Sequence, residues 1–98
     1  MFINIIKSSR YVVGLADEEL IGKKFEEGKL QLDVKESFYK GEKKSKEEIK
    51  DILIKMKIED ATFNIVGDKS VKLALEEGII IEENVSEIKG IKFAMTFM

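Results

Sequence analysis

One stretch in the second half of the chain constrains the fold more than any other. Residues 61 to 66 are mostly apolar, and they lead directly into Gly67-Asp68-Lys69-Ser70 and a helical pattern. A mostly apolar run of this length that ends at a glycine is typical of a strand buried on both faces of a sheet. The sequence therefore predicts a central strand, a tight turn at Gly67 and a helix that Asp68 caps.

Another predicted helix, which precedes this strand in the chain, has the clearest sequence signals of any element. Ser45 and Glu48 have the spacing of a capping box. Apolar residues then recur at helical spacing, which indicates a helix with one buried face that ends near Lys57. These residues are Ile49, Ile52, Leu53 and Met56.

The remaining segments are mostly strand-like. Residues 2–7 and 10–16 predict a hairpin, residues 29–35 a half-buried strand, residues 79–81 a short buried strand and residues 86–97 a closing hairpin. By contrast, the acidic start of residues 17–25 favours a short helical turn capped by Asp17. Residues 36–44 are predicted to form a loop.

These elements indicate an α+β fold in a single globular domain, residues 1–98. We expect a mixed, mostly antiparallel sheet of about five strands with two main helices packed on one face. A partly parallel sheet stays open, because strands and helices alternate through the middle of the chain.

Composition excludes several classes of function. The chain has no His and no Cys, so it lacks the usual general base, a thiolate nucleophile and a zinc-finger ligand set. A net charge of −2 is wrong for a broadly basic nucleic-acid coat but leaves room for a local basic patch. No apolar run is long enough to span a membrane and no signal peptide is expected, so we expect a cytoplasmic protein. The enrichment in Lys and Glu fits either a thermophile or an AT-rich genome.

The turn after the central strand is a candidate anion site. Gly67, Lys69 and Ser70 would offer backbone N–H groups, a helix dipole and one positive charge to a phosphate. The competing interpretation is an ordinary capped helix, in which the carboxylate of Asp68 occupies the same N–H groups.

The predicted loop before the capping box is a candidate RNA site. Two aromatic rings beside lysines can stack on bases and neutralise phosphates of a single strand. The alternative is that an aromatic ring fills the core while the lysines are solvated. The candidate RNA-binding residues are Phe38, Tyr39, Lys40, Lys43 and Lys44.

Two further features have weaker signals. The acidic residues of segments 17–19 and 26–27 could hold a hard cation, but a solvated acidic surface explains them better. The apolar strand from Ile91 to Met98 could be a free sheet edge that pairs with a second copy, or simply a core strand. We predict no catalytic residue, no metal ligand and no cofactor.

Several blocks of the sequence resemble an archaeal family of short proteins known only by a domain-of-unknown-function label, numbered four-two-four. The blocks lie in the family's order along nearly the whole chain. They are Asp17 to Lys23, Gly28-Lys29-Leu30, Glu36 to Tyr39, Asn64 to Gly67 with Val71, Leu73, Ala74 and Gly78, and Ile88 with Gly90-Ile91. The resemblance implies an archaeal cytoplasmic protein linked to translation, and it implies no reaction.

Three functions follow from these observations as expectations. The first is a non-enzymatic binding protein associated with RNA or the translation machinery, with ribosome-associated proteins as further partners. The second is a protein–protein adaptor or homodimer. The third, least favoured, is a metal-assisted phosphate-handling enzyme built on residues 67–70 and 17–19; on balance we expect no enzymatic activity.

Overall fold

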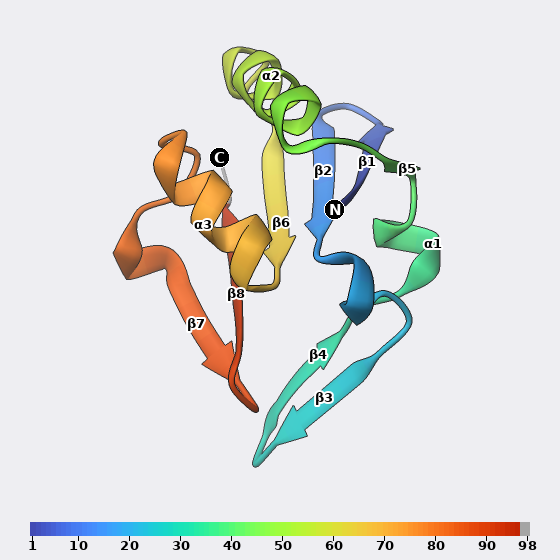
Figure 1. Cartoon of the computed structure of the whole chain (residues 1–98), viewed down its shortest axis with the longest axis vertical. Coiled ribbons are helices and arrows are strands. Elements are labelled where there is room, and N and C mark those ends of the chain that lie inside the picture. Colours follow the sequence, from blue (N-terminus) through green and yellow to red (C-terminus); the bar gives the residue numbers. More distant parts are fainter. Residues whose placement is uncertain (97–98) are drawn as a thin grey trace.

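The computed structural model describes residues 1–96. The main sheet has six strands in the order β5-β1-β2-β6-β8-β7, and β3 and β4 form a separate two-stranded sheet (Figure 1). The strands are β1 (Phe2–Lys7), β2 (Tyr11–Ala16), β3 (Lys24–Glu27), β4 (Leu30–Asp33), β5 (Glu42–Lys43), β6 (Thr62–Val66), β7 (Val85–Ile88) and β8 (Ile91–Thr96). The helices are α1 (Glu36–Tyr39), α2 (Lys46–Ile58) and α3 (Asp68–Glu76), with 3-10 turns η1 (Glu18–Leu20) and η2 (Glu82–Asn84).

The α+β prediction is confirmed, with one strand more in the main sheet than the expected number of about five. All neighbouring strands of this sheet are antiparallel except β2 and β6, which are parallel. The predicted central strand is β6, and it lies between β2 and β8. The predicted hairpins are β1–β2 and β7–β8.

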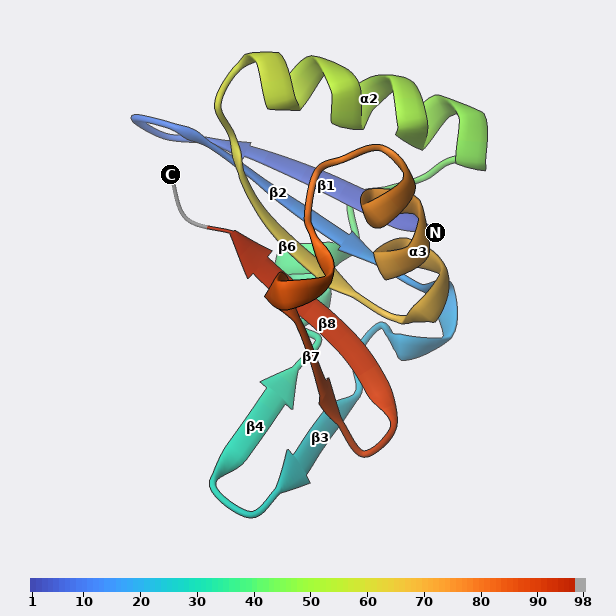
Figure 2. The ribbon, with the colours of Figure 1, turned by 90° about the vertical axis from the view of Figure 1, so that its left-hand side faces the viewer.

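The main sheet is covered on both faces, as Figure 2 shows for α2 and α3 on one side and hairpin β3–β4 on the other. Alternation along each strand divides the core accordingly. Leu15 and Ile65 pack with Ile49 and Leu53 of α2 in the larger cluster. The next residues along these strands, Ala16 and Val66, point to the opposite face of the sheet and pack on the side of hairpin β3–β4. This smaller cluster joins Ala16, Val66 and Ile88 to Leu32, Val34 and Tyr39.

Helix α2 begins as the sequence predicts. The Ser45 hydroxyl accepts a hydrogen bond from the Glu48 N–H at 3.2 Å, and the Glu48 carboxylate accepts one from the Ser45 N–H at 3.1 Å. These bonds, together with the charge of Lys44, lower the pKa of Glu48. Helix α3 is followed by Gly78 in a left-handed conformation, which is typical of the residue after the C-cap of a helix.

Three local predictions are wrong. The helical turn expected over residues 17–25 stops at Leu20, and residues 24–27 form strand β3. Gly22, with φ +83°, turns the chain away from the helix. The expected loop over residues 36–44 contains α1 and β5, and residues 79–81 form no strand.

The C-terminal strand is an interior strand over its described residues. β8 pairs with β6 along residues 93–96 and with β7 along residues 91–94. The expected free edge is therefore absent at residues 93 and 94, where both neighbours use the backbone groups, whereas residues 91–92 pair with β7 alone and residues 95–96 with β6 alone. Phe97 and Met98, which the prediction also included, lie outside the described residues.

The described part of the chain contains no helix that is both long enough and apolar enough to cross a membrane.

Candidate functional site

The N-terminus of α3 is capped by a residue from a distant part of the sequence. Gly67 occupies the cap position, and Asp68 is the first helical residue. The carboxylate of Asp17 accepts hydrogen bonds from the Lys69 N–H at 3.1 Å and from the Ser70 N–H at 2.8 Å. It also accepts one from the Ser70 hydroxyl at 2.7 Å. The predicted cap at Asp68 is therefore wrong, because Asp17 fills this role.

This junction is closed to solvent. Asp17 is 3% exposed and Ser70 is fully buried. Gly67 has φ +108°, and a Cβ atom there would meet the carboxyl carbon of Asp17 at 2.3 Å. An external anion at the N–H groups of Gly67, Lys69 and Ser70 would have to displace Asp17. Of the predicted anion-binding residues, only Lys69 offers a side chain that is exposed.

The two aromatic residues of the candidate RNA site pack against the core, Tyr39 buried and Phe38 half-buried. Tyr39 is 6% exposed, and its ring lies edge-on to the ring of Phe38 with centroids 4.8 Å apart. Phe38 itself covers Gly14 of β2, where an added Cβ would meet the ring at 3.0 Å. Burial, together with the charge of Asp33, raises the pKa of Tyr39 to about 12. The aromatic platform that the sequence predicted is thus part of the core beneath the sheet.

The lysines of the same candidate site lie on the surface. Lys40 and Lys43 are exposed and Lys44 is half-buried. Lys43 forms an ion pair with Glu18 at 2.9 Å, and Lys44 forms one with Glu42 at 3.0 Å. The hydrogen bond from Lys43 lowers the pKa of Glu18 most, and the charge of Lys69 also lowers it.

A groove lies beside Lys69, one of the predicted anion-binding residues. It has a volume of about 340 Å³ and lies where the first turn of α2 faces α3. Three lysines from the two helices line it together with Met1, Leu73 and Glu76; they are Lys46, Lys69 and Lys72. We call this feature the lysine groove.

One carboxylate partly offsets the charge of the lysine groove. Glu76 on α3 lies 3.9 Å from the ammonium of Lys46, and both side chains are about half exposed. An exposed pair of this geometry contributes little to stability and exchanges readily with other ions. The groove therefore has three positive charges and one negative charge in a protein whose net charge is −2.

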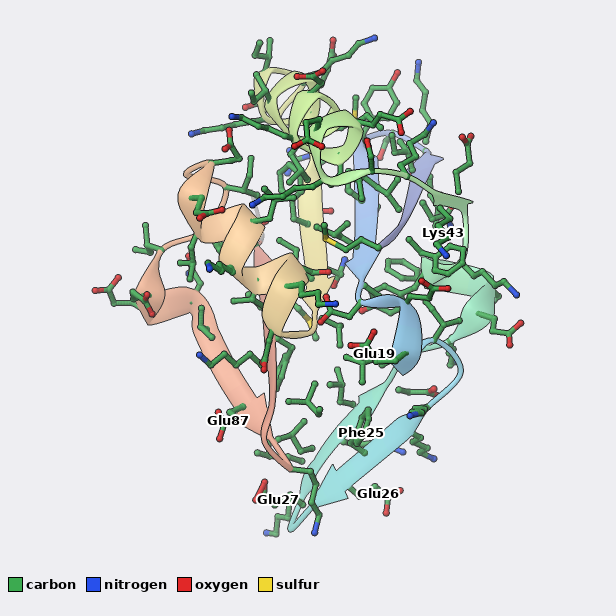
Figure 3. The ribbon with its side chains drawn as sticks, viewed as in Figure 1. Glu19, Phe25, Glu26, Glu27, Lys43 and Glu87 are labelled. Carbon is green, nitrogen blue, oxygen red and sulfur yellow. The ribbon has the colours of Figure 1, made fainter. Side chains whose placement is uncertain are left out.

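The predicted acidic cation site is dispersed. Asp17 points into α3, Glu18 pairs with Lys43, and Figure 3 shows Glu26 and Glu27 near the tip of hairpin β3–β4. Figure 3 also places Glu87 at this end of the molecule, away from Lys43. Within residues 1–96, no group of three potential metal ligands comes together.

Comparison with known proteins identifies the chain at the level of family. The sequence pattern of the family described as "Protein of unknown function (DUF424)" matches residues 6–98. The chain belongs to this family. A crystal structure of an uncharacterised conserved protein from Methanopyrus kandleri is similar to it, with a TM-score of 0.81 at 20% identity over 97% of this chain and 88% of that one. At this identity the likeness shows a shared fold, and no curated protein matches the sequence.

Two features of this DUF424 protein escaped sequence reasoning. The contact between Asp17 and Ser70 has no local signature, because the residues are 53 positions apart. Lys72 had a usable signal: it lies three residues after Lys69, and residues at this spacing share one face of a helix. The association of that face with Lys46 depends on how α2 and α3 pack, which only the structure provides.

Proposed function

We propose that this DUF424 protein is a non-enzymatic binding protein that contacts RNA phosphates through the lysine groove, in association with the translation machinery of an archaeal cell. The observation that carries the proposal is the meeting of Lys46, Lys69 and Lys72 at one groove. Cationic side chains that converge from two elements are the arrangement that phosphate groups favour.

The mode of binding differs from the one that the sequence suggested. Tyr39 is buried and half-buried Phe38 is packed against β2, so stacking on the ring of Tyr39 would require the core to open. Lysines bind phosphates as point charges and do not distinguish one base from another. We therefore propose contacts to the RNA backbone that are independent of sequence, with Lys43 and Lys40 extending the path beyond the groove.

Each neutralised phosphate of a single strand contributes a slope of about −0.7 to a plot of log affinity against log salt concentration. Three lysines in the groove therefore predict a slope of about −2. Because net charge is −2 and Glu76 lies beside Lys46, affinity should be moderate at low salt and weak at physiological salt.

The test is binding of a fluorescent single-stranded RNA, measured by anisotropy at several salt concentrations. The double variant Lys69→Glu, Lys72→Glu should lose at least about tenfold in affinity and flatten the salt dependence. Its matched control is Lys23→Glu, Lys29→Glu, which makes the same change of charge at exposed positions on and beside hairpin β3–β4. Equal losses of RNA affinity in the two double variants would show that only net charge matters. That result would contradict the lysine groove as the binding site.

A further inference from the structure

One edge of the main sheet is only partly covered. β5 pairs with β1 at Phe2 and Ile3 alone. Within residues 1–96, no strand pairs with residues 4–7 of β1 on this side. A strand edge with unpaired N–H and C=O groups is a template for pairing with another chain.

The direction of the backbone groups at this edge follows from one hydrogen bond. The Lys44 N–H donates to the Met1 carbonyl at 3.2 Å, so Met1 directs its carbonyl toward β5. Alternate residues of an antiparallel strand direct their backbone groups to the same side. Ile5 and Lys7 therefore present their N–H and C=O groups to the uncovered part of the edge, whereas Ile6 bonds toward β2.

Two of the three side chains on this uncovered stretch are apolar, and the third is Lys7. Ile5 is 39% exposed and Ile6 is 38% exposed, on opposite faces of the sheet. A groove of about 310 Å³ runs beside the edge, and its lining includes Ile3, Ile5, Ile52 of α2 and Glu42. Ile5 thus offers an apolar contact on the face of the sheet that α2 covers, and Ile6 offers one on the opposite face.

We propose that this edge binds a second copy of the chain, with the two β1 strands antiparallel and a two-fold axis at Ile6. In this register Ile5 of each copy forms a hydrogen-bonded pair with Lys7 of the other, and the two Ile6 side chains meet as a close pair without backbone hydrogen bonds. The two sheets then continue through the interface as one. The proposal concerns self-association and is independent of RNA binding.

Geometry and charge select this register and this occupant. An axis at Ile5 would place Lys7 opposite Ile3, where Glu42 already pairs. An axis at Lys7 would place two lysines directly opposite each other, which is unfavourable. The axis at Ile6 uses the uncovered residues 5–7, and it brings the basic turn of each copy, which begins at Lys7, toward Glu42 of the other. Glu42 is 74% exposed and can accept this second cation beside Lys44.

A cysteine cross-link tests the register, because the chain has no cysteine of its own. Residues opposite each other in such a close pair have Cα atoms about 4.5 Å apart, within the range of a disulfide. Ile6→Cys should therefore give a disulfide-linked dimer on mild oxidation at micromolar concentration. The matched control is Ile58→Cys on α2, where the parent side chain is 78% exposed, and it should stay mostly monomeric. Equal cross-linking of the two variants, or a monomeric Ile6→Cys protein, would overturn the proposal.

Analytical ultracentrifugation of the unmodified chain gives the second test. The chain should show a concentration-dependent equilibrium between monomer and dimer. Ile6→Lys should shift the dissociation constant upward by at least about tenfold, because two ammonium groups would face each other at the axis. Ile58→Lys should leave the dissociation constant unchanged. A chain that stays monomeric at every concentration up to the millimolar range, or a dimer that is insensitive to Ile6→Lys, would contradict pairing through β1.

Discussion

The carboxylate of Asp17 and the side chain of Ser70 form a fully buried contact of 2.7 Å that joins the end of β2 to the first turn of α3. The Asp17 N–H also donates to the carbonyl of Val66, at 3.0 Å, so the main chain and the side chain of Asp17 both hold this junction. A carboxylate at a helix N-terminus is stabilised by the helix dipole and by the N–H groups it accepts from. The site where the sequence suggested an external anion is thus occupied by the protein's own anion.

The first prediction concerns this contact. Asp17→Ala should lower the free energy of unfolding by about 3 kcal/mol, because the Ser70 hydroxyl and two N–H groups would be buried without an acceptor. Asp68→Ala removes a carboxylate at the neighbouring exposed position and should cost at most about 0.5 kcal/mol. Urea unfolding followed by circular dichroism measures both. A larger loss of stability for Asp68→Ala than for Asp17→Ala would indicate that Asp68 caps the helix.

The second prediction concerns the glycine beside this contact. Gly67→Ala should destabilise the protein by at least about 2 kcal/mol, because the added Cβ would overlap the Asp17 carboxyl group and because φ is positive. Gly28 also has a positive φ, of 60°, but nothing lies within 4 Å of its added Cβ. Gly28→Ala should therefore show the backbone cost alone, about 1 kcal/mol. Equal losses of stability would mean that Gly67 is needed only for its backbone conformation.

Asp17 and Gly67 also show what the sequence could and could not predict. The strand β6, the turn at Gly67 and the helix α3 were predictable because their signals are local: an apolar run, a glycine and an amphipathic pattern. The same holds for the capping box of α2. The role of Asp17 was not predictable, since its two acidic neighbours, Glu18 and Glu19, form a helix-like pattern with Leu20 that favours a local cap. Only the parallel pairing of β2 with β6 brings Asp17 to α3.

The strands that sequence reasoning missed are short or ambiguous. β5 has two residues, too few for any alternation to be visible. β3 follows an acidic helical start, and its pairing with β4 through Gly28 outweighs that local preference. The lysine groove was only partly predictable: Lys69 was predicted as an anion-binding residue, whereas its proximity to Lys46 depends on how α2 and α3 pack.

The third prediction concerns the buried phenol of Tyr39. In the variant Tyr11→Phe, Tyr39 is the only tyrosine, and its ultraviolet titration should have a midpoint near pH 12. The folded pKa is raised above the unfolded value of about 10, so the unfolded state loses its proton first. Stability should therefore be unaffected below pH 10 and should fall as pH rises from about 10 to about 12. A titration midpoint at pH 10 with the fold intact would show that the ring is accessible, as stacking on RNA would require.

The fourth prediction concerns Glu76 in the lysine groove. Glu76→Gln removes the carboxylate that lies 3.9 Å from Lys46 and should raise RNA affinity by about threefold at low salt. Glu77→Gln is the matched control: Glu77 pairs with Lys50 at 3.7 Å and is not part of the groove lining. Anisotropy titration at two salt concentrations should show the gain for Glu76→Gln shrink as salt rises. An equal gain in both variants would indicate a general charge effect.

Binding at the lysine groove can be tested by a nuclear magnetic resonance titration of the isotope-labelled protein with a short single-stranded RNA. We expect the largest shifts of backbone amide signals at Lys46, Lys69, Lys72 and Leu73, with the signals of Phe38 and Tyr39 unchanged. Shifts centred on Phe38 and Tyr39, or no shifts at millimolar RNA and low salt, would contradict the proposal that the lysine groove binds RNA.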